Sequence, residues 1–368
     1  MARILIWGRH GGFGPDYPRN RTMQALMREL GHELTQFQPS LSRFGDLQYR
    51  LARKPRPDLV WVSCFRQRDL LAAARYARRA HVPLVFDPLI SAFDKQTSER
   101  TKFSADSWRG RRLLAWERRV FAAPDWVIAD TAGHAAYFHQ TLGVPRARLR
   151  VIAVGAEEAL FSPLPPVAPA AVREVVFFGS FIGLQGLPVI TQAIAACHDL
   201  PLRFRLLGDG PERKAAEAAL ATQVAAGQVV FEPWCPLQEL PARLASADVF
   251  LGIFGASPKA LRVIPNKVYQ ALALGRPVIT ARSSAYPEPL LARDDAGLCW
   301  VAPGDPDGLH AALRAVADPG WDGALAACRA AETYRHWFAL PRLRAELADL
   351  LRACLAPQSA KPWEGDRV

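Results

Sequence analysis

The feature that most constrains this fold is a repeated alternation of short apolar runs with amphipathic helical stretches. In the first half of the chain, strand-like runs cover Arg3–Trp7, Leu59–Ser63, Leu84–Phe86, Trp126–Ala129 and Leu149–Ala153. Helical patterns lie between them at 22–30, 67–80, 108–121 and 132–142. Short strands that alternate with helices predict a parallel sheet with helices on both faces.

The alternation restarts after a proline-rich stretch. Residues 162–171, SPLPPVAPAA, have four prolines and no regular period, which predicts a linker. Beyond it, strands are predicted at 175–178, 204–207, 229–231, 249–253 and 278–280, and helices at 188–197, 211–225, 237–246, 265–274 and 308–317. The 368 residues also exceed what one core usually holds.

We therefore predict an α/β protein of two Rossmann-like, doubly wound domains, at residues 1–165 and 172–335. The amphipathic segment 340–356 is predicted to be a helix that packs back on the first domain. In doubly wound sheets, ligands bind at the carboxyl ends of the strands, so we expect the ligand site in a cleft between the domains.

Cysteine usage and the amino terminus indicate a cytoplasmic protein. The six cysteines are scattered without a CxxC pair, which favours reduced thiols and argues against a zinc site. No charged, apolar and cleavable leader precedes the first strand, and the longest apolar stretches, such as 247–256, are too short to cross a bilayer.

The positive charge lies entirely in the first half of the chain. Residues 1–165 carry 26 basic and 15 acidic side chains, whereas residues 166–368 carry 20 of each. Within the first half, residues 95–119 hold eight basic side chains together with Trp108 and Trp116. One interpretation is a solvated helix face. The other is a surface for an anionic membrane or an anionic lipid-linked substrate. No nucleic-acid-binding motif accompanies the charge, so we expect no nucleic-acid partner.

The glycine-rich segment at 8–21, GRHGGFGPDYPRNR, raises the question of a dinucleotide-binding loop. A G-x-G-x-x-G motif that starts at Gly12 and Gly14 needs a third glycine where Tyr17 stands, and the segment has no P-loop lysine. The next candidate acids for a ribose, Glu29 and Glu33, do not end a second strand. The dinucleotide interpretation is therefore weak. The glycines and the basic residues after them favour close approach of the backbone to an anionic ligand, with a tight turn as the plain alternative.

Three motifs in the second half indicate a phosphate site. FFGSFIGLQGL at 177–187 and LLGDGPE at 206–212 each combine a strand end with a glycine-rich turn. IPNKVYQALALGRPVITA at 264–281 has Lys267 in the first turn of a helix and Gln270 one turn later. A cation in the first turn of a helix suits a diphosphate, because the helix dipole and the ammonium both attract anions.

At this point the sequence resembles the group 1 glycosyltransferases (glycosyltransferase family 4, GT-B fold), and in particular a bacterial branch. The resemblance rests on GGFG near the amino terminus and on GDGPER, ASADVFLGIF, KVYQALALGRPVIT and AYPE in the second half. DYPRNR, FDPLIS, ADTAGHAAYF and GSFIGLQG point to the branch. The resemblance covers residues 1 to about 355.

The resemblance implies a retaining transfer of a hexose-type sugar from a nucleotide-sugar donor to a hydroxyl of a glycan, polysaccharide or lipid-linked acceptor. The second domain binds the donor and the first binds the acceptor. It implies no cofactor, because the nucleotide-sugar is a substrate, and no metal, because protein cations and helix N-termini stabilise the leaving diphosphate. Asp294 and Asp295 are adjacent acids but lie outside the implied diphosphate site. The implied location is the cytoplasm, including the inner face of the membrane.

By the same resemblance, the donor site draws on both domains. The donor-binding residues are Gly12, Gly14, Gly179, Ser180, Gln185, Gly208, Gly210, Trp234, Arg262, Asn266, Lys267 and Gln270. Lys267 is the expected phosphate ligand and a catalytic residue. The chain also departs from the family pattern: Ser180 and Gln185 stand where an arginine and a lysine are common, and Gln270 stands where a glutamate usually binds the ribose.

On the acceptor side, Asp87 ends a strand where many relatives have a histidine, and it is the second predicted catalytic residue. It orients or deprotonates the acceptor hydroxyl, or else it caps the following helix. Arg19, Asn20, Asp94 and His134 are the predicted acceptor-binding residues. For His134 a capping-turn or packing role is the alternative.

Two other classes of function compete with a transferase. The missing arginine, lysine and glutamate motivate a noncatalytic GT-B protein that binds a sugar nucleotide or acts as a scaffold. An oxidoreductase is disfavoured, because the opening loop lacks the dinucleotide fingerprint.

Overall fold

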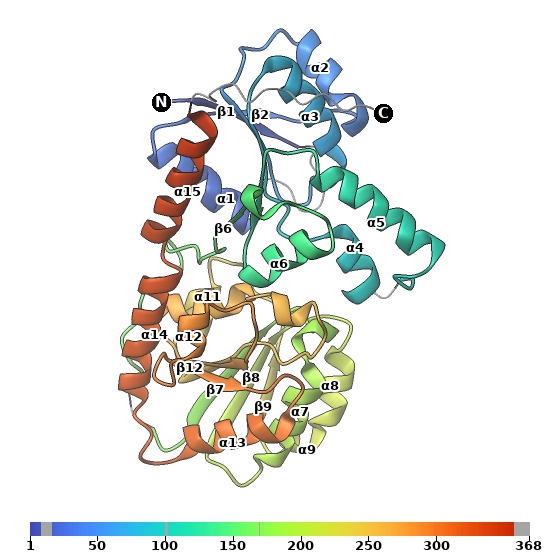
Figure 1. Cartoon of the computed structure of the whole chain (residues 1–368). Coiled ribbons are helices and arrows are strands. Elements are labelled where there is room, and N and C mark those ends of the chain that lie inside the picture. Colours follow the sequence, from blue (N-terminus) through green and yellow to red (C-terminus); the bar gives the residue numbers. More distant parts are fainter. Residues whose placement is uncertain (9–16, 100–101, 169, 357–368) are drawn as a thin grey trace. The chain divides into compact units, whose positions relative to one another are not determined.

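The computed structural model describes residues 1–8, 17–99, 102–168 and 170–356. It contains two six-stranded sheets, one in each half of the chain (Figure 1). The prediction of an α/β protein with two Rossmann-like, doubly wound domains is confirmed.

The first sheet has the strand order β2-β1-β3-β4-β5-β6. Its strands are β1 (Arg3–Trp7), β2 (Glu33–Phe37), β3 (Leu59–Val62), β4 (Leu84–Phe86), β5 (Trp126–Ala129) and β6 (Leu149–Val151). Pairings among β1 to β5 are parallel. The associated helices are α1 (Pro18–Glu29), α2 (Gly45–Leu51), α3 (Gln67–Ala80), α4 (Ala92–Asp94), α5 (Trp108–Phe121) and α6 (Ala132–Gln140). Single turns η1 (Ser42–Phe44) and η3 (Arg146–Arg148) and the π-helical η2 (Lys95–Glu99) complete this half.

The second sheet has the order β12-β11-β10-β7-β8-β9, with all five pairings parallel. Its strands are β7 (Arg173–Gly179), β8 (Leu202–Gly208), β9 (Val229–Glu232), β10 (Val249–Leu251), β11 (Val278–Ala281) and β12 (Leu298–Val301). The helices are α7 (Leu187–Ala196), α8 (Arg213–Ala219), α9 (Ala221–Ala225), α10 (Leu240–Leu244), α11 (Asn266–Ala273), α12 (Glu288–Leu291), α13 (Pro306–Ala317), α14 (Gly323–Trp337) and α15 (Leu340–Leu355), with single turns η4 (Gly183–Gln185) and η5 (Ala260–Arg262).

Strand β7 is buried on both faces and carries the core of the second sheet. Val175 and Phe177 pack into one hydrophobic cluster with Ile190 of α7 and Leu313 of α13. Val176 and Phe178, which alternate with them, are also buried. Burial on both faces explains why β7 reads as a continuous apolar run, which is typical of central strands in parallel sheets.

Six strands and helices are missing from the sequence prediction: β2, β12, α2, α4, α12 and α14. Strands β2 and β12 lie at the edges of their sheets and are only partly buried. Strand β2 has no continuous apolar run, whereas β12 is a short apolar run that the prediction overlooked. Glu33 begins β2, which ends at Phe37, so no acid stands at the end of that strand. Helix α2 is short, and α14 is rich in alanine, which gives a weak apolar period.

By contact density the chain divides into two compact units. The first unit comprises residues 1–88 and 123–127 with α15 from Arg344 onward, and the second comprises 89–122 and 128–343. The second unit therefore contains the whole second sheet together with α4, α5 and α6. The domain boundaries inferred from the sequence, including the packing of the last helix, stay a prediction.

A buried carboxylate within the second unit fixes α4 against α5. Glu117 of α5 is fully buried and accepts hydrogen bonds from the Ser91 hydroxyl at 2.6 Å and from the backbone N–H groups of Ala92 and Phe93 at 2.6 and 2.8 Å. Ser91 in turn caps α4 by accepting from the backbone N–H of Asp94. The position of Asp94 therefore depends on Glu117.

Replacing Glu117 tests this arrangement. Glu117→Ala leaves one hydroxyl and two backbone N–H groups without their acceptor, so we expect the free energy of unfolding to fall by about 3 kcal/mol. Urea denaturation measures the loss. The matched control is Glu239→Ala, an exposed position, where we expect a change within about 0.5 kcal/mol. Equal effects at both positions would contradict the assigned role of Glu117.

Candidate active site

The ends of β7 and β8 approach each other too closely for side chains. Gly179 pairs with Gly208 in the parallel ladder. A Cβ on Gly208 would lie 2.0 Å from the carbonyl oxygen of Gly179, and a Cβ on Gly210 would lie 1.8 Å from that of Ser180. Both glycines also have positive φ, at 132° and 155°. The predicted donor residues Gly179, Ser180, Gly208 and Gly210 thus form one closely packed edge of backbone, at which Gly179 and Gly208 are buried.

Lys267 extends its ammonium to this backbone edge from the first turn of α11. Its Nζ would lie 2.8 Å from a Cβ on Gly179, and it lies 3.5 Å from the centre of the Phe177 ring. Lys267 is 6% exposed, and Nζ has no hydrogen-bond partner among the described residues. Burial lowers the pKa of this ammonium well below its usual value. The described residues of the site therefore hold a buried amino group and no anion beside it.

Gln185 approaches the same point from η4. A Cβ on Gly179 would lie 2.6 Å from the Gln185 Oε1 and 2.7 Å from its Nε2. The Oε1 is buried and has no hydrogen-bond partner in the part of the chain that the structure describes. Gly179, Gln185 and Lys267 therefore converge, as the sequence predicts for donor-site residues.

Three neighbours of this cluster were missed by the sequence analysis. Phe177 provides the aromatic face under the ammonium. The motif placed Phe177 near a strand end but did not predict its contact with Lys267. Glu212 has a buried Oε2 without a described partner, and burial raises the pKa of its carboxyl. Arg213 donates to the carbonyl oxygen of Gly208 and, at 3.0 Å, to that of Glu232, which fixes the glycine turn. GDGPER contains the last two residues.

The remaining predicted donor residues are less closely joined to the cluster. Asn266 begins α11, and Gln270 is a buried residue one turn after Lys267. Trp234 follows β9 and is half exposed. Gly12 and Gly14 lie outside the described residues, so their predicted roles stay predictions.

Arg262 pairs with a predicted acceptor residue. Its Nη2 donates to Asp94 Oδ1 at 2.8 Å, and its guanidinium lies 4.4 Å from the centre of the Tyr137 ring. The Thr131 hydroxyl donates to the Arg262 carbonyl oxygen at 2.6 Å, and a Cβ on Gly133 would lie 3.2 Å from the Arg262 Cα, which is a tight contact. Within the second unit, these contacts connect α4 and α6 to the turn that precedes α11.

His134 is part of the same region through the first turn of α6. Thr131 is the helix N-cap, and its hydroxyl accepts from the backbone N–H of His134. Nδ1 of His134 lies 2.5 Å from Asp130 Oδ1, and its ring stacks on Phe138. His134 is 1% exposed, so capping and packing contacts account for most of its surroundings.

In the first unit, two predicted site residues hold each other. Arg19 Nε donates to Asp87 Oδ2 at 2.9 Å, and the two side chains are 0% and 2% exposed. Asn20 Oδ1 accepts from the backbone N–H of Cys64 at 3.2 Å. Ser91 is the N-cap of α4, so the alternative prediction that Asp87 caps the following helix is wrong.

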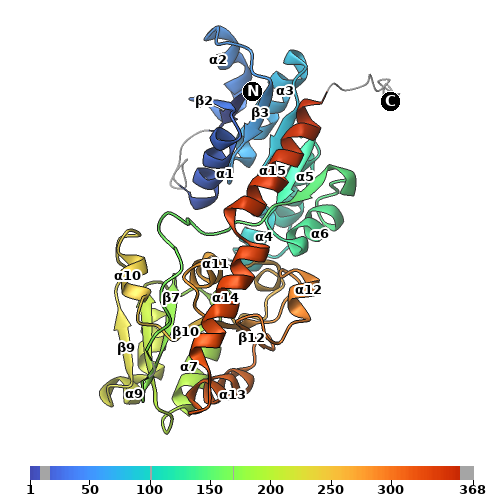
Figure 2. The ribbon, with the colours of Figure 1, turned by 90° about the vertical axis from the view of Figure 1, so that its left-hand side faces the viewer.

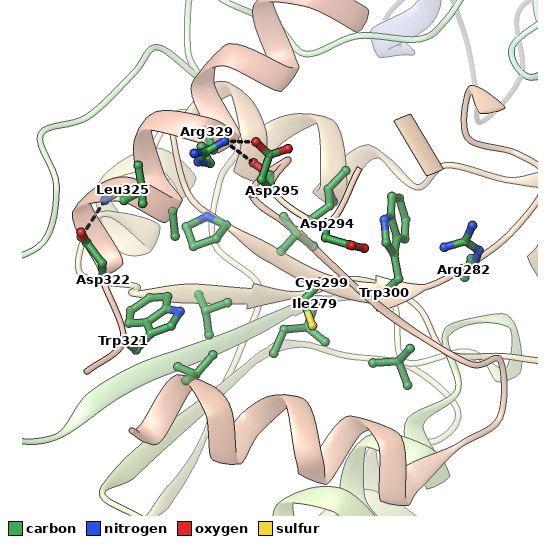
Figure 3. A pocket seen from close by; sticks show the side chains of 18 of the residues that line it. Ile279, Arg282, Asp294, Asp295, Cys299, Trp300, Trp321, Asp322, Leu325 and Arg329 are labelled. Atoms are coloured by element: carbon green, nitrogen blue, oxygen red, sulfur yellow. Dashed lines mark hydrogen bonds and ion pairs between the residues drawn. The ribbon is translucent and has the colours of Figure 1, made fainter. Parts of the chain in front are cut away.

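A large apolar cavity lies elsewhere in the second unit. Its volume is about 930 Å³, and it follows β11 and the edge strand β12 toward α13 and α14 (Figure 3). Trp300, Trp321 and Leu325 contribute to its walls, and Asp294 and Asp295 to its rim. Asp295 is held by Arg293 and Arg329, which lower the pKa of its carboxyl. None of the predicted site residues lines this cavity.

The described residues contain no group of three or more histidine, cysteine, aspartate or glutamate side chains arranged to hold a metal ion. Over the same residues, every helix is too short or too polar to span a bilayer.

Comparison with known families identifies both halves of the chain. Residues 14–155 match the model of the glycosyl transferase 4-like domain, and residues 172–318 match that of glycosyl transferases group 1.

Curated relatives cover part of the chain. It is 32% identical over 223 residues to an Escherichia coli K12 protein described as a colanic acid biosynthesis glycosyltransferase, WcaL, a match that covers 58% of this chain and 53% of that protein. It is 26% identical over 308 residues to a D-inositol 3-phosphate glycosyltransferase of Nocardiopsis dassonvillei, covering 77% and 68%. The chain thus spans about half the length of the WcaL relatives that it matches.

Solved structures share the fold across almost the whole chain. Anabaena Alr3699/HepE in complex with UDP has a TM-score of 0.69 at 16% identity, covering 96% of this chain and 100% of that one. Sucrose-phosphate synthase of Thermosynechococcus elongatus has a TM-score of 0.72 at 16% identity, covering 96% and 99%. These similarities establish a GT-B fold.

The buried pair of Arg19 and Asp87 predicts a pattern in a double-mutant cycle. Arg19→Met or Asp87→Leu alone removes one member of a buried ion pair and should lower the free energy of unfolding by roughly 3 to 5 kcal/mol. The double variant should recover most of that loss, because no unpaired charge remains. Urea denaturation of the four proteins measures the coupling. Additive losses would show that the ion pair is not the dominant interaction of these residues.

Lys267→Met should stabilise the ligand-free protein by about 2 kcal/mol at neutral pH, because it removes an unpaired buried cation. The lowered pKa of Lys267 means that the unfolded chain binds its proton more tightly than the folded chain. Wild-type stability should therefore rise with pH between that lowered pKa and about 10.5, and Lys267→Met should lack this rise. Urea denaturation at several pH values checks both effects, with exposed Lys214→Met as the control. A destabilised Lys267→Met protein would contradict the assignment.

Proposed function

Because the chain belongs to the group 1 glycosyltransferases, we propose that it transfers a sugar from a nucleotide-sugar donor to a hydroxyl group of a glycan or lipid-linked acceptor. The bond from the anomeric carbon to the donor diphosphate breaks, and a bond from that carbon to the acceptor oxygen forms. The diphosphate keeps the electron pair, and the acceptor hydroxyl loses its proton. A group that stabilises negative charge on the diphosphate is therefore the main requirement.

The observation that carries this proposal is the unpaired, buried ammonium of Lys267 beside the glycine backbone of β7 and β8. A buried cation costs free energy unless an anion accompanies it, and a diphosphate is such an anion. The absence of side chains at Gly179, Gly208 and Gly210 lets the two strand ends approach each other and lets the Lys267 ammonium reach the backbone of Gly179. The N-terminus of α11 adds a favourable dipole.

The proposal includes a metal-independent reaction with retention at the anomeric carbon. Lys267 and the α11 N-terminus supply the positive charge that a metal supplies in other phosphate sites. UDP is the first nucleotide to test, because solved structures of Anabaena HepE hold UDP and UDP-glucose. In this mechanism the Asp87 carboxylate orients the acceptor by its charge. It does not act as a general base, because Arg19 already binds it.

The acceptor proposed is a polysaccharide or glycolipid intermediate at an anionic membrane surface. The relative described as a colanic acid glycosyltransferase supports a polysaccharide pathway. The excess of basic residues, which lies wholly in residues 1–165, supports an anionic surface or an anionic lipid-linked acceptor.

A noncatalytic sugar-nucleotide-binding protein is the second candidate function. Ser180 and Gln185 are uncharged, so among the described residues that converge on Gly179, Lys267 supplies the positive charge. A leaving diphosphate held by one cation is stabilised less than one held by several. Binding of a nucleotide-sugar without turnover on any acceptor would favour this candidate.

The decisive test compares wild type with Lys267→Met. Thermal shifts with UDP, GDP, TDP, CDP and ADP, with and without EDTA, identify the nucleotide, and we expect one of them to stabilise the wild type independently of EDTA. Transfer or hydrolysis of the matching nucleotide-sugar should fall by about 10²- to 10³-fold in kcat/KM for Lys267→Met. The configuration of the product, determined by NMR, tests retention.

Lys214→Met serves again as the matched control and should keep both the thermal shift and the turnover. Since Lys267→Met is expected to be more stable than wild type, unfolding cannot explain its loss of activity. Turnover at the wild-type rate in Lys267→Met would refute the proposed mechanism, and a thermal response to NAD alone would refute the proposed substrate class.

A further inference from the structure

An exposed apolar stripe runs along α2 and the turn before it. Leu41, Phe44, Leu47 and Leu51 are 58%, 53%, 50% and 74% exposed. Leu47 and Leu51 are four residues apart and lie on one face of α2, while Leu41 and Phe44 belong to the turn before it. We call these four residues together with the cations around them the α2 surface. Single exposed leucines are ordinary, but four large apolar side chains within eleven residues are not.

The α2 surface has a rigid support. The opposite face of α2 is buried through Gly45, Asp46 and Tyr49, and α2 packs against α3 (Figures 1 and 2). Arg75 of α3 binds Asp46 through two hydrogen bonds of 2.7 and 3.1 Å and also donates to the carbonyl oxygen of Arg43 at 2.6 Å. Arg79 of α3 binds Asp46 at 3.0 Å. The leucines are therefore exposed on an anchored helix rather than on a frayed end.

Cations surround the apolar stripe. Residues 38–57 contain five basic side chains, all of them exposed: Arg43, Arg50, Arg53, Lys54 and Arg56. The one acidic residue of this segment, Asp46, is buried and already bound by Arg75 and Arg79. The α2 surface therefore combines apolar side chains with a strong positive charge.

We propose that the α2 surface docks onto a membrane that contains anionic lipids, which deepens the proposed function by assigning its membrane partner to named residues. Leucine and phenylalanine side chains on one helix face can enter the boundary between headgroups and acyl chains. Arginine and lysine side chains at the rim of that face lie at the level of the lipid phosphates and gain from the negative surface potential. The segment carries both kinds of side chain in this arrangement.

Other occupants fit the α2 surface less well. A second copy of the chain would bring two sets of five cations together, and like charges oppose that contact. Single-stranded nucleic acid gains affinity from stacking on aromatic rings, and the stripe has one aromatic ring and three leucines. Helix α5 is also basic, but it has one large exposed apolar side chain, Trp108, whereas the α2 surface has four.

Vesicle flotation of the full chain tests the proposal. We expect binding to vesicles of phosphatidylcholine and phosphatidylglycerol, little binding to phosphatidylcholine alone, and release at high salt. Leu47→Gln/Leu51→Gln should lower binding by about tenfold or more, since two exposed leucines no longer enter the membrane. Arg50→Gln/Arg53→Gln/Lys54→Gln should remove the preference for the anionic vesicles.

Two controls make the result specific. Val224→Gln/Val230→Gln removes two exposed apolar side chains in the second unit and should leave vesicle binding unchanged. Trp108→Gln on α5 should also leave it largely unchanged. Loss of binding in Trp108→Gln but not in the leucine variant would overturn the proposal in favour of α5. A wild-type dimer that becomes monomeric in the leucine variant, measured by light scattering, would overturn it in favour of a second copy.

The proposed membrane surface and the proposed enzymatic function can be refuted independently of each other. The leucine variant should keep the nucleotide-induced thermal shift of the wild type, because α2 contains none of the donor-site residues. A wild type that responds to a nucleotide but ignores both kinds of vesicle would overturn the membrane surface alone. Vesicle binding without any nucleotide response would support the surface and count against the donor site.

Discussion

The rest of the candidate site depends on one physical constraint, which is the burial of the Lys267 ammonium. The ammonium is buried between the Phe177 ring and the glycine backbone of β7, and the described residues supply no anion for it. The ring face compensates part of the charge, because its quadrupole attracts cations. Binding of an anionic ligand in the site would offset the remaining cost in free energy. Without that ligand, the fold is less stable than it would be with an uncharged side chain at position 267.

The sequence predicted the elements that carry strong local signals and missed those that depend on distant partners. Helices α3 and α5 were predicted at their observed bounds, and α5 begins directly after its Ser107 cap. The edge strand β2 was missed because its alternation is weak. In the site, glycine turns and a helical lysine are visible locally, whereas the contact of Arg262 with Asp94 joins residues 168 positions apart. No spacing rule predicts such a pair.

Charged residues serve two separate purposes in this chain. Some are buried and bound by partners within the fold, such as Glu117, which binds a hydroxyl and two backbone N–H groups, and Arg19, which binds Asp87. These residues determine where loops lie and cannot attract a ligand without giving up a partner. The cations of residues 43–56 are exposed, so their charge acts on the surroundings. Counting charges in the sequence could not separate the two groups.

The close approach of β7 and β8 has a consequence for how this chain can evolve. The obstacle to a side chain at Gly208 or Gly210 is a backbone carbonyl oxygen, which every amino acid carries. A substitution at the facing residue therefore cannot create the missing space, so neither glycine can be rescued by a compensating change opposite it. Sequence variation around this cluster must proceed through surrounding side chains such as Gln185, Glu212 and Gln270, while these two backbone positions remain fixed.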